Sequence, residues 1–576
     1  MYVVAYEDAF LRMKPMKPAK YAWYLRNEAL EEADIDSPLH SKVLEVLARR
    51  GLSTTKQVES WLHNKTITSP WDMEGMEVAS KRILQAIEQH EKIMVYGDYD
   101  VDGVCSTTIM VKALRQLFGV VVGYVPNRFE EGYGFHDKWV TWAANEGIRL
   151  IITVDVGITA NETIQYAKEN GIDVIVTDHH YTQDFPDAAY AVLHPSKAPS
   201  ACSNLCGAGI AWKLACAISG REVTELLDLV AVATLADQVP LIDENRVLVR
   251  AGLQQLHERM NVGLLALCTE MKLTGYVNAE DIGFKLAPAL NAVGRIDSAM
   301  KAFRLLMEEN FGKAKVKAEE AVRLNEHRKE LTDRVEAQAI EQIEANKHWT
   351  LQDTIVVAGP YETWHEGVIG IVAGRLAERY HRPTVCLSVH EGVAKGSGRS
   401  VEGFDLYEAL YKLSERGLFQ KFGGHAMAAG LSMDVKNIPA LRDLLHVEST
   451  KQKIPQAQYV ADAELSLHQL SYSLLNDLEK IGPFGNGNEK PMFWLRDAYV
   501  TEMNWLGKEN KYFYLKVAHP GTLSYKALVF RHPEWYKRLE ERKAKSLHFS
   551  IDLLVQLHEN IWQDKSTIQM VVIDWQ

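Results

Sequence analysis

Three aspartates at alternate positions stand directly after an apolar, strand-length run. The run IMVYG (93–97) is followed by Asp98, Asp100 and Asp102, and then by residues that favour a helix. Carboxylates that converge at the end of a buried strand repel one another and lose hydration, so a bound cation is needed to offset that cost. The spacing therefore predicts a site for a divalent metal ion.

A second cluster of possible ligands follows another apolar run. Asp178, His179 and His180 come at the end of DVIVT (173–177). Adjacent side chains of an extended segment point to opposite sides, so one histidine is expected to bind metal and the other to touch the scissile phosphate or support the ligands. Carboxylates with imidazole suit Mn²⁺ or Mg²⁺, and two such clusters suit a two-ion phosphoester hydrolase.

Two further aspartates complete the candidate ligand set. Asp155 follows an apolar run in TVDVG, and Asp237 ends an apolar helical segment, LLDLVAVATLADQVPL (226–241). Each of them alone would be an ordinary cap or surface acid. Combined with the two clusters, they are predicted to help bind a pair of ions.

A calcium-binding loop is the main alternative for the aspartate run. Gly103 falls at the sixth position counted from Asp98, but the twelfth is Ile109 rather than glutamate. The flanks also read as a strand and a helix instead of two helices. The catalytic-metal hypothesis is therefore favoured over a calcium loop or a solvated acidic turn.

Alternating strands and helices surround these residues. Four apolar, strand-length runs occupy residues 93–97, 120–125, 150–154 and 173–177. The alternation predicts an α/β fold with a parallel sheet and helices on both faces, and ligands bind such sheets beyond the carboxyl ends of the strands. Asp98, Asp155 and Asp178 fall at that edge.

The remainder of the chain predicts additional domains. A long charged stretch without proline is expected to form a helix between two domains, a second and smaller α/β unit follows it, and the aromatic, strand-rich end suggests a β-barrel of the OB type. The predicted division is an N-terminal segment packing on the core (1–75), a catalytic α/β domain (76–310), a connecting helix (311–346), a smaller α/β domain (347–450) and an OB-like barrel (451–576).

Glycine-rich stretches of the second α/β unit carry candidate anion ligands. Glycines there expose backbone N–H groups beside Ser397, Arg399 and His425, which suits a phosphate cradle, although turns explain the glycines equally. Arg128 and Arg295 lie in similar loop-like contexts. Spacing alone does not separate phosphate binding from structural salt bridges.

Composition narrows the class of protein. The chain has 576 residues, 47% hydrophobic and 24% charged, which is typical of a soluble protein of several domains. No run is long enough to cross a membrane, and six cysteines without paired spacing predict a reduced, cytoplasmic protein with no membrane partner. The net charge of −12 argues weakly against nucleic acid, but the metal-binding aspartates contribute to it.

In order and spacing, the motifs resemble those of the DHH phosphoesterase superfamily. GDYDVDG, TVDVG, TDHH and TLADQVPL correspond to its four motifs. GVIGIVAGRLAERYHRPTVCLS, GSGRSVEGFDL and FGGHAMAAG look like its DHHA1 domain, and NAVGRIDSA resembles the linker of the RecJ single-strand exonucleases. The resemblance includes the OB-like end and covers the chain from about residue 40.

This resemblance implies a 5′→3′ exonuclease that degrades single-stranded DNA with two Mn²⁺ or Mg²⁺ ions, in recombination and repair. The residues implied to bind or adjoin the metals are Asp98, Asp100, Asp102, Asp155, Asp178, His179, His180 and Asp237, with Asp100, Asp102, His179 and His180 as the catalytic set. The residues implied to hold the substrate phosphates are Arg128, Arg295, Ser397, Arg399 and His425. A single-strand-binding protein and a RecQ-type helicase are the implied protein partners.

The sequence departs from the family pattern at two positions. Tyr96 stands four residues before Asp100, where many relatives have histidine, and Val156 stands where a few have cysteine or histidine. Because tyrosine cannot replace an imidazole ligand, the exact ligand set stays open.

Two other functions remain open. A phosphodiesterase for short oligonucleotides or cyclic dinucleotides would share the metal motifs but would need no barrel for a long strand. A non-catalytic replication scaffold of the same fold would be expected to lose metal ligands, whereas every aspartate is present. In the barrel, stacking aromatics with Lys508, Lys511 and Lys516 are the predicted strand contacts, and solubilising lysines are the alternative.

Overall fold

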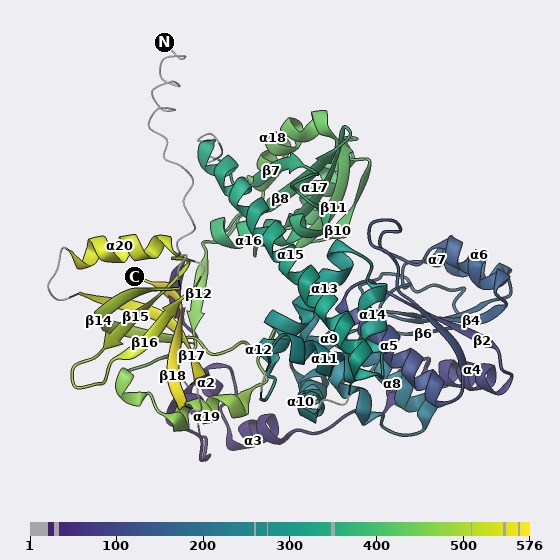
Figure 1. Ribbon diagram of the computed structural model, residues 1–576, viewed down its shortest axis with the longest axis horizontal. Helices are drawn as coiled ribbons and strands as arrows, with labels where there is room; N and C mark the ends of the chain where they lie inside the picture. The colour runs from purple at the N-terminus through teal and green to yellow at the C-terminus, as the bar shows by residue number, and fades with distance from the viewer. Residues whose placement is uncertain are drawn as a thin grey trace, which may run out of the picture.

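The structure is a computed structural model (Figure 1). It describes residues 21–27, 34–258, 261–273, 275–346, 349, 352–507, 510–530, 532–544, 549–562 and 565–576.

A five-stranded parallel sheet forms the first α/β unit, with strand order β3-β2-β4-β5-β6. Its strands are β2 (Lys92–Gly97), β3 (Val120–Tyr124), β4 (Ile148–Val154), β5 (Asp173–Thr177) and β6 (Ala191–Leu193). The prediction of a parallel sheet is confirmed. Along β2, Ile93 and Val95 face one apolar cluster whereas Met94 and Tyr96 face another, so both faces of the sheet are buried.

Helices cover both faces of this sheet. The cluster on one face contains residues of α4 (Met76–Glu88), α5 (Val101–Gln116) and α8 (Gly207–Ser219). The cluster on the other face contains residues of α6 (Asp137–Asn145) and α7 (Asn161–Glu169). Helical layers then continue the unit, through α9 (Leu227–Ala236), α10 (Asp243–Glu258), α11 (Val262–Glu270), α12 (Ala279–Asp281), α13 (Ala287–Ile296) and α14 (Met300–Leu306).

The long helix α15 (Phe311–Ala345) connects two hydrophobic cores (Figure 1). Its first half buries Ala314, Ala318 and Ala321 in the core of the first α/β unit. Its second half buries Val335, Ala339 and Ile343 against the second α/β unit. Both stripes follow helical spacing, so one rigid element fixes the distance between the two units.

The second α/β unit has a mixed sheet with strand order β10-β11-β9-β8-β7. Its strands are β7 (Ile355–Pro360), β8 (Thr384–His390), β9 (Val393–Arg399), β10 (Lys421–His425) and β11 (Ala428–Asp434). Only the β7–β8 pair is parallel. Residues of α15 and α16 (Glu366–Tyr380) form one cluster on this sheet, and residues of α17 (Leu406–Ser414) and α18 (Ile438–Ser449) form the other.

A closed β-barrel ends the chain. The sheet order is β13-β14-β15-β16-β18-β17, and a further pairing of β14 with β17 closes it. The strands are β13 (Ala463–Glu464), β14 (Phe493–Leu506), β15 (Tyr512–Ala518), β16 (Tyr525–Val529), β17 (Ser550–Trp562) and β18 (Lys565–Trp575), with α19 (Tyr472–Ile481) and α20 (Glu534–Lys543) beside them. Closure removes the exposed strand edges that an open sheet would leave.

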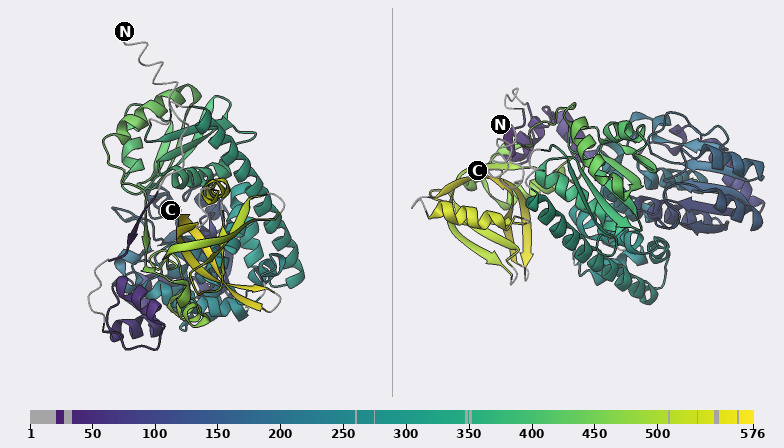
Figure 2. Two further views of the ribbon diagram at one scale, coloured as in Figure 1. Left: turned by 90° about the vertical axis from the view of Figure 1, so that its left-hand side faces the viewer. Right: turned by 90° about the horizontal axis from the view of Figure 1, so that it is seen from above.

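The described N-terminal residues pack mainly on this barrel. Helices α2 (Ser41–Arg49) and α3 (Thr55–His63) contribute to the apolar cluster of the barrel, and β1 (Ala22–Leu25) pairs in parallel with β12 (Gln458–Ala461). In Figure 2 the purple N-terminal helices accordingly lie next to the yellow-green C-terminal elements. The sequence predicted an N-terminal unit (1–75) packing on the core; its limits stay a prediction, and the core that α2 and α3 join is that of the barrel.

All six cysteines are buried and free of disulfide bonds. Among the helices that the structure describes, none has both the length and the apolar character that a bilayer crossing requires.

Candidate metal centre and phosphate pocket

The aspartate run lies at the junction of β2 and α5. Asp100 caps the helix, because its side chain accepts hydrogen bonds from the backbone N–H groups of Asp102 (2.9 Å) and Gly103 (3.1 Å). Asp98 is buried, and its Oδ1 has no hydrogen-bond partner. The strand end and the helix start therefore hold three carboxylates in one small region.

Asp102 is held by the N-terminus of a second helix. Its two carboxylate oxygens accept hydrogen bonds from the backbone N–H groups of Gly207 (2.6 Å) and Ala208 (2.8 Å), which begin α8. The partial positive charge of a helix N-terminus stabilises a carboxylate in this position. A Cβ atom at Gly207 would lie 2.6 Å from the Cβ of Asp155, so only glycine allows the helix to approach this closely.

Asp155 directly follows β4 and has a strained backbone conformation. Its φ is +61°, in the left-handed region that residues other than glycine seldom adopt. Such strain costs about 1–3 kcal/mol and is concentrated at functional sites. The side chain is buried, and its Oδ1 lacks a hydrogen-bond partner.

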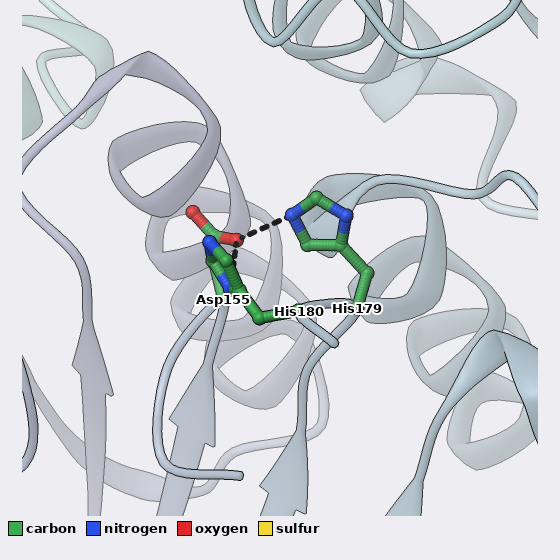
Figure 3. A group of neighbouring side chains, drawn as sticks. All are labelled: Asp155, His179 and His180. Carbon is green, nitrogen blue, oxygen red and sulfur yellow. Dashed lines mark ion pairs between the residues drawn. The ribbon is translucent and has the colours of Figure 1, made fainter. Parts of the chain in front are cut away.

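His179 points its Nε2 atom into this group of carboxylates. Figure 3 shows the ion pair of His179 with Asp155, whose Oδ1 lies 3.1 Å from Nε2; Asp102 Oδ2 lies 3.7 Å away. It is 3.6 Å from Asp237 Oδ2, on the residue that caps the C-terminus of α9. The Nε2 atom has no hydrogen-bond partner. Burial lowers the pKa of His179, which favours the neutral imidazole that binds metals.

His180 turns toward a different partner. Its Nδ1 lies 2.7 Å from Asp178 Oδ1, which also accepts hydrogen bonds from the backbone N–H groups of His179 and His180. Burial alone would lower the pKa of His180, but the hydrogen bond and charge of Asp178 raise it to about 9. The two histidines therefore differ in their hydrogen-bond partners. The prediction that they point to opposite sides is wrong, because their rings lie 4.6 Å apart and His180 Nδ1 also lies 4.0 Å from Asp155 Oδ1.

The oxygens of Asp178 are occupied by protein donors. In addition to the contacts of Oδ1, its Oδ2 accepts a hydrogen bond from the backbone N–H of Ile158 (2.9 Å). Burial raises the pKa of Asp178, but these hydrogen bonds outweigh it and keep the pKa below its usual value. This arrangement orients the two histidines. Direct metal binding by Asp178 stays a prediction.

The other aspartates are costly to ionise together. Burial, with repulsion from Asp102, raises the pKa of Asp237 to about 8. Burial and neighbouring aspartates also raise the pKa values of Asp98, Asp102 and Asp155. These carboxyl groups therefore retain protons at a pH at which an exposed aspartate is ionised, unless a cation replaces the protons.

The donor set fits two neighbouring divalent cations. Within each of three groups the possible ligand atoms lie no more than 4.8 Å apart; the groups are Asp102, His179 and Asp237; Asp98, Asp100 and Asp155; and Asp155, His179 and His180. Asp155 and His179 occur in two groups each, so the positions adjoin. Carboxylate oxygens with one imidazole suit Mn²⁺ or Mg²⁺.

The two departures from the family pattern belong to the core. Tyr96 is fully buried, packs against Phe135 at a ring distance of 5.1 Å and donates its hydroxyl hydrogen bond to the Gly134 carbonyl (2.9 Å). Val156 is buried in the same apolar cluster. Both side chains therefore serve the packing of this face of the sheet.

Three arginines from separate parts of the chain meet beside the aspartates. Burial, together with the charges of Arg128 and Arg399, lowers the pKa of Arg295 to about 10, and burial with the charge of Arg128 lowers the pKa of Arg399. Within the described part of the chain, none of the three forms an ion pair with a carboxylate. Partly buried cations without a counter-ion indicate a pocket for an anion.

The arginine pocket directly adjoins the aspartate run. Arg128 lies over the ring of Tyr99, with its guanidinium carbon 5.2 Å from the ring centre. A Cβ atom at Gly294 would lie 2.9 Å from the Tyr99 carbonyl oxygen, so α13 packs tightly against the loop between Asp98 and Asp100. Tyr99 is therefore the point of contact between the two charged groups.

The N-terminus of α16 contributes to the pocket. A Cβ atom at Gly370, in its first turns, would lie 2.9 Å from Ser397 Oγ and 3.2 Å from Arg399 Nη2. Arg399 donates hydrogen bonds to Ser397 Oγ (3.1 Å) and to the Gly398 carbonyl (2.7 Å). A helix N-terminus beside an arginine and a hydroxyl group suits a phosphate.

His425 shares a sheet face with the pocket. Strand register pairs His425 with Ala428, and Ala428 with Arg399, so these three side chains lie on one face of the sheet. Two strand spacings separate His425 from Arg399 by about 10 Å. His425 is exposed, and its Nδ1 accepts a hydrogen bond from the backbone N–H of Met427 (3.3 Å).

Sequence reasoning missed three residues of this site. The Tyr133 hydroxyl lies 3.3 Å from His180 Nδ1. Arg328, buried on α15, contributes to the positive field at Arg295. His365 caps α16 by accepting a hydrogen bond from the Gly367 N–H (3.0 Å). The two glycines that flank Tyr133 were a usable sign of a loop, whereas nothing distinguishes Arg328 from other charges of a long helix.

The structure describes two of the three barrel lysines that were predicted to contact a DNA strand, Lys511 and Lys516. Lys508 lies outside the described residues. Lys516 pairs with Glu502 at 2.6 Å, and both side chains are partly exposed. The use of Lys508, Lys511 and Lys516 by a DNA strand stays a prediction.

Family models match three parts of the chain. A model of the DHH family N-terminal domain matches residues 92–234, one of the DHHA1 domain matches 352–448, and one of the RecJ OB domain matches 461–574. These ranges fall inside three of the predicted domains, whose limits stay a prediction.

Curated relatives and solved structures agree with these models. The single-stranded-DNA-specific exonuclease RecJ of Bacillus subtilis is 40% identical over 481 residues, covering 81% of this chain and 60% of the relative. The Escherichia coli protein of the same name is 35% identical over 500 residues, covering 81% and 85%. The crystal structure of RecJ in complex with Mn²⁺ from Thermus thermophilus has a TM-score of 0.79 at 27% identity, covering 96% and 79%.

Mn²⁺ is expected to raise the unfolding temperature more at pH 8 than at pH 6. Protons compete with the ion for Asp98, Asp155 and Asp237, whose pKa values are raised. Without metal, the pH dependence of stability has the opposite sign. The folded state keeps protons that the unfolded chain releases, so the contribution of Asp237 to the free energy of unfolding falls as pH rises from 3.8 to about 8. Thermal scans with EDTA and with Mn²⁺ at both pH values measure this. Equal Mn²⁺ shifts would contradict it, and Asp155→Asn should reduce the difference.

Replacing Asp178 by asparagine is expected to lower the pKa of His180 from about 9 toward 6.5, because the charge that raises it is lost. NMR titration of the imidazole in metal-free protein measures the value. Asp184→Asn, which changes an exposed acid of the following loop, is the control and should leave the value unchanged. A His180 pKa that stays near 9 in Asp178→Asn would show that another group holds the proton.

Proposed function

The chain belongs to the RecJ family of single-stranded-DNA-specific exonucleases, and we propose that it removes nucleotides successively from the 5′ end of a DNA strand. The choice of the 5′ end rests on one observation. The arginine pocket, which lacks a carboxylate partner, adjoins the carboxylate centre, and Tyr99 lies between them. A terminal phosphate would fill that pocket and bring a phosphodiester close to the metals. The process would serve recombination and repair.

Mn²⁺ or Mg²⁺ ions, held by Asp98, Asp100, Asp102, Asp155, His179 and Asp237, would supply the charge that stabilises the attacking and leaving oxygens and would lower the pKa of water. The protein itself supplies the positions. The N-termini of α5 and α8 fix Asp100 and Asp102. Asp178 keeps His180 protonated and orients it, so that its positive charge can meet a phosphate oxygen.

The second α/β unit would hold the terminal nucleotide. Arg128, Arg295, Arg399 and Ser397 would bind the 5′ phosphate at the N-terminus of α16. His425 lies about 10 Å from Arg399 along the same sheet face, a spacing that leaves room for about one nucleotide between the terminal and the scissile phosphate. The expected product is therefore a mononucleotide.

Two glycines leave part of the sheet face near Arg399 and His425 without side chains. Gly423 pairs with Gly430, and Gly430 with Ser397, so both lie on the face that carries Arg399 and His425. Neither has a positive φ, and a Cβ atom on either would meet nothing within 4 Å. Glycine costs about 0.5–1 kcal/mol relative to alanine in a strand. Since packing does not require these glycines, close approach of a nucleotide is the proposed reason for them.

The barrel would hold the strand downstream of the site. Its exposed aromatics and cation–π pairs, such as Arg496 over Trp494 at 3.8 Å, suit stacking of bases and contact with phosphates. A single-strand-binding protein and a RecQ-type helicase are proposed as partners, since they would present and generate the single strands that the enzyme consumes.

A long single strand labelled at either end tests the proposal. With Mn²⁺, a 5′ label is expected to appear at once as a mononucleotide, whereas a 3′ label should shorten gradually. Asp100→Ala and His179→Ala should each slow release by about 10³-fold, because the charge at the reacting phosphate is lost. Arg399→Ala should abolish any preference for a 5′ phosphate over a 5′ hydroxyl group.

The same assay separates the rival functions. Consumption of short oligonucleotides alone would favour the phosphodiesterase. Unchanged release by Asp100→Ala and His179→Ala would remove the metal assignment. Circular dichroism should show that these variants keep the fold.

Gly430→Ala is expected to leave the unfolding temperature unchanged or slightly higher and to lower kcat/KM by about tenfold, because a methyl group would occupy the space of the nucleotide. Steady-state kinetics and a thermal scan measure the two effects. Gly283→Ala is the matched control, since a Cβ atom there also meets nothing within 4 Å and the residue is far along the chain in a helical turn. Unchanged kcat/KM in Gly430→Ala would exclude this face as the substrate surface.

A further inference from the structure

A tight turn of the C-terminal region rests on the chain immediately after Asp237. In this turn Gly485 and Asn488 exchange backbone hydrogen bonds of 3.0 and 3.1 Å. At its tip, the Asn486 side chain donates a hydrogen bond from Nδ2 to the Gln238 carbonyl (2.7 Å). The Asn486 carbonyl accepts a hydrogen bond from the Leu241 backbone N–H (2.7 Å).

The segment that Asn486 touches needs external support. Helix α9 ends at Ala236 with Asp237 as its cap, and the next residue, Gln238, has a φ of +57°. A residue other than glycine in this left-handed conformation costs about 1–2 kcal/mol. The hydrogen bonds of Asn486 reach the carbonyl of this strained residue and the N–H of Leu241, so they fix the backbone directly after the Asp237 carboxylate.

The turn also fits the segment sterically. A Cβ atom at Gly485 would lie 2.7 Å from Leu241 Cδ1, and one at Gly487 would lie 3.3 Å from Pro240 Cβ. The two chains therefore touch at points on both sides of Asn486. Contact this close leaves little freedom for the turn to shift against the segment.

The turn is anchored within the C-terminal region by Asn488. This side chain is buried, and its Nδ2 donates hydrogen bonds to the carbonyls of Ile481 (3.1 Å) and Pro483 (2.8 Å). Arg50 donates a further hydrogen bond to Asn488 Oδ1 (3.2 Å) and pairs with Asp462 at 2.9 Å. The region that carries the barrel thus fixes the position of Asn486, and Arg246 of the metal-binding domain adds hydrogen bonds to the carbonyls of Ile481 (3.1 Å) and Gly482 (2.6 Å).

We propose that Asn486 positions Asp237 for metal binding, so that the region which carries the barrel also shapes the metal centre. The inference rests on the proposed function in one respect, the role of Asp237 as a ligand. Asn486 is a positioning residue, because it acts through Gln238 and touches neither metal nor substrate. Residues that orient metal ligands typically change metal affinity 10–100-fold when they are removed.

Asn486→Ala is the test, with Mn²⁺ affinity measured by isothermal titration calorimetry. The full-length variant is expected to bind Mn²⁺ about tenfold more weakly than the wild-type protein. Its unfolding temperature in EDTA and its affinity for a single-stranded oligonucleotide without metal should be unchanged. Nuclease kcat should recover at saturating Mn²⁺, whereas half-maximal activity should require about tenfold more of the ion.

Asn504→Ala is the matched control, because Asn504 is an exposed asparagine of the same region with a side-chain hydrogen bond of 2.6 Å to Glu502. It should bind Mn²⁺ as the wild-type protein does. An equal loss of affinity in both variants would overturn the inference, as would wild-type Mn²⁺ affinity in Asn486→Ala or a loss that accompanies a lower unfolding temperature.

Asp237→Asn separates this inference from the proposed function. If Asp237→Asn weakens Mn²⁺ binding and Asn486→Ala does not, the positioning role alone is excluded. If Asp237→Asn binds Mn²⁺ normally, Asp237 is not a ligand and both assignments fail.

Discussion

The mutual repulsion of buried carboxylates is the constraint on which this structure depends. Asp98, Asp102 and Asp155 are almost fully buried, and Asp155 lies close both to His179 and to the position of Asp98 and Asp100, an arrangement that costs several kcal/mol per unpaired charge. The fold offsets part of this cost with the N–H groups of two helices. Cations would offset the rest, so the centre is complete only when metal is bound.

A positively charged region adjoins this centre, and it requires an anion where the centre requires cations. Arg128, Arg295 and Arg399 lack carboxylate partners even though aspartates lie close by, because Tyr99 and the tight packing of α13 separate the two groups. If they had paired directly, each would have neutralised the other and neither would bind a ligand. Instead, the carboxylates stay available for cations and the arginines for an anion, so under the proposed function metal and substrate would meet without direct contact between their protein ligands.

Much of this was predictable from the sequence, because the parallel strands are short apolar runs and their polar residues follow at once. Asp98, Asp155 and Asp178 were expected at one sheet edge, and the structure brings them to that edge. Different hydrogen-bond partners for His179 and His180 also followed from their adjacency, although the rings lie 4.6 Å apart rather than on opposite sides. The occupied oxygens of Asp178 did not, since they depend on the N–H of Ile158, which reaches it from another strand end.

Contacts between distant segments were beyond sequence reasoning. Arg328 is one charge among many on a long helix until tertiary packing places it near Arg295. The alignment of His425 with Arg399 depends on strand register, which no local pattern specified. Asn486 lies in an ordinary turn sequence, and its contact with Gln238 spans almost half of the chain.

The pairing of β1 with β12 has a consequence for biosynthesis. The first described strand, Ala22–Leu25, finds its partner only at Gln458–Ala461, and helices α2 and α3 share the core of the barrel. Because a chain emerges from the ribosome N-terminus first, the two α/β units can fold before the N-terminal segment has its partner. The barrel must therefore be synthesised before β1, α2 and α3 can pack, and a chain that stops short of it would lack both the barrel and the turn that contacts Gln238.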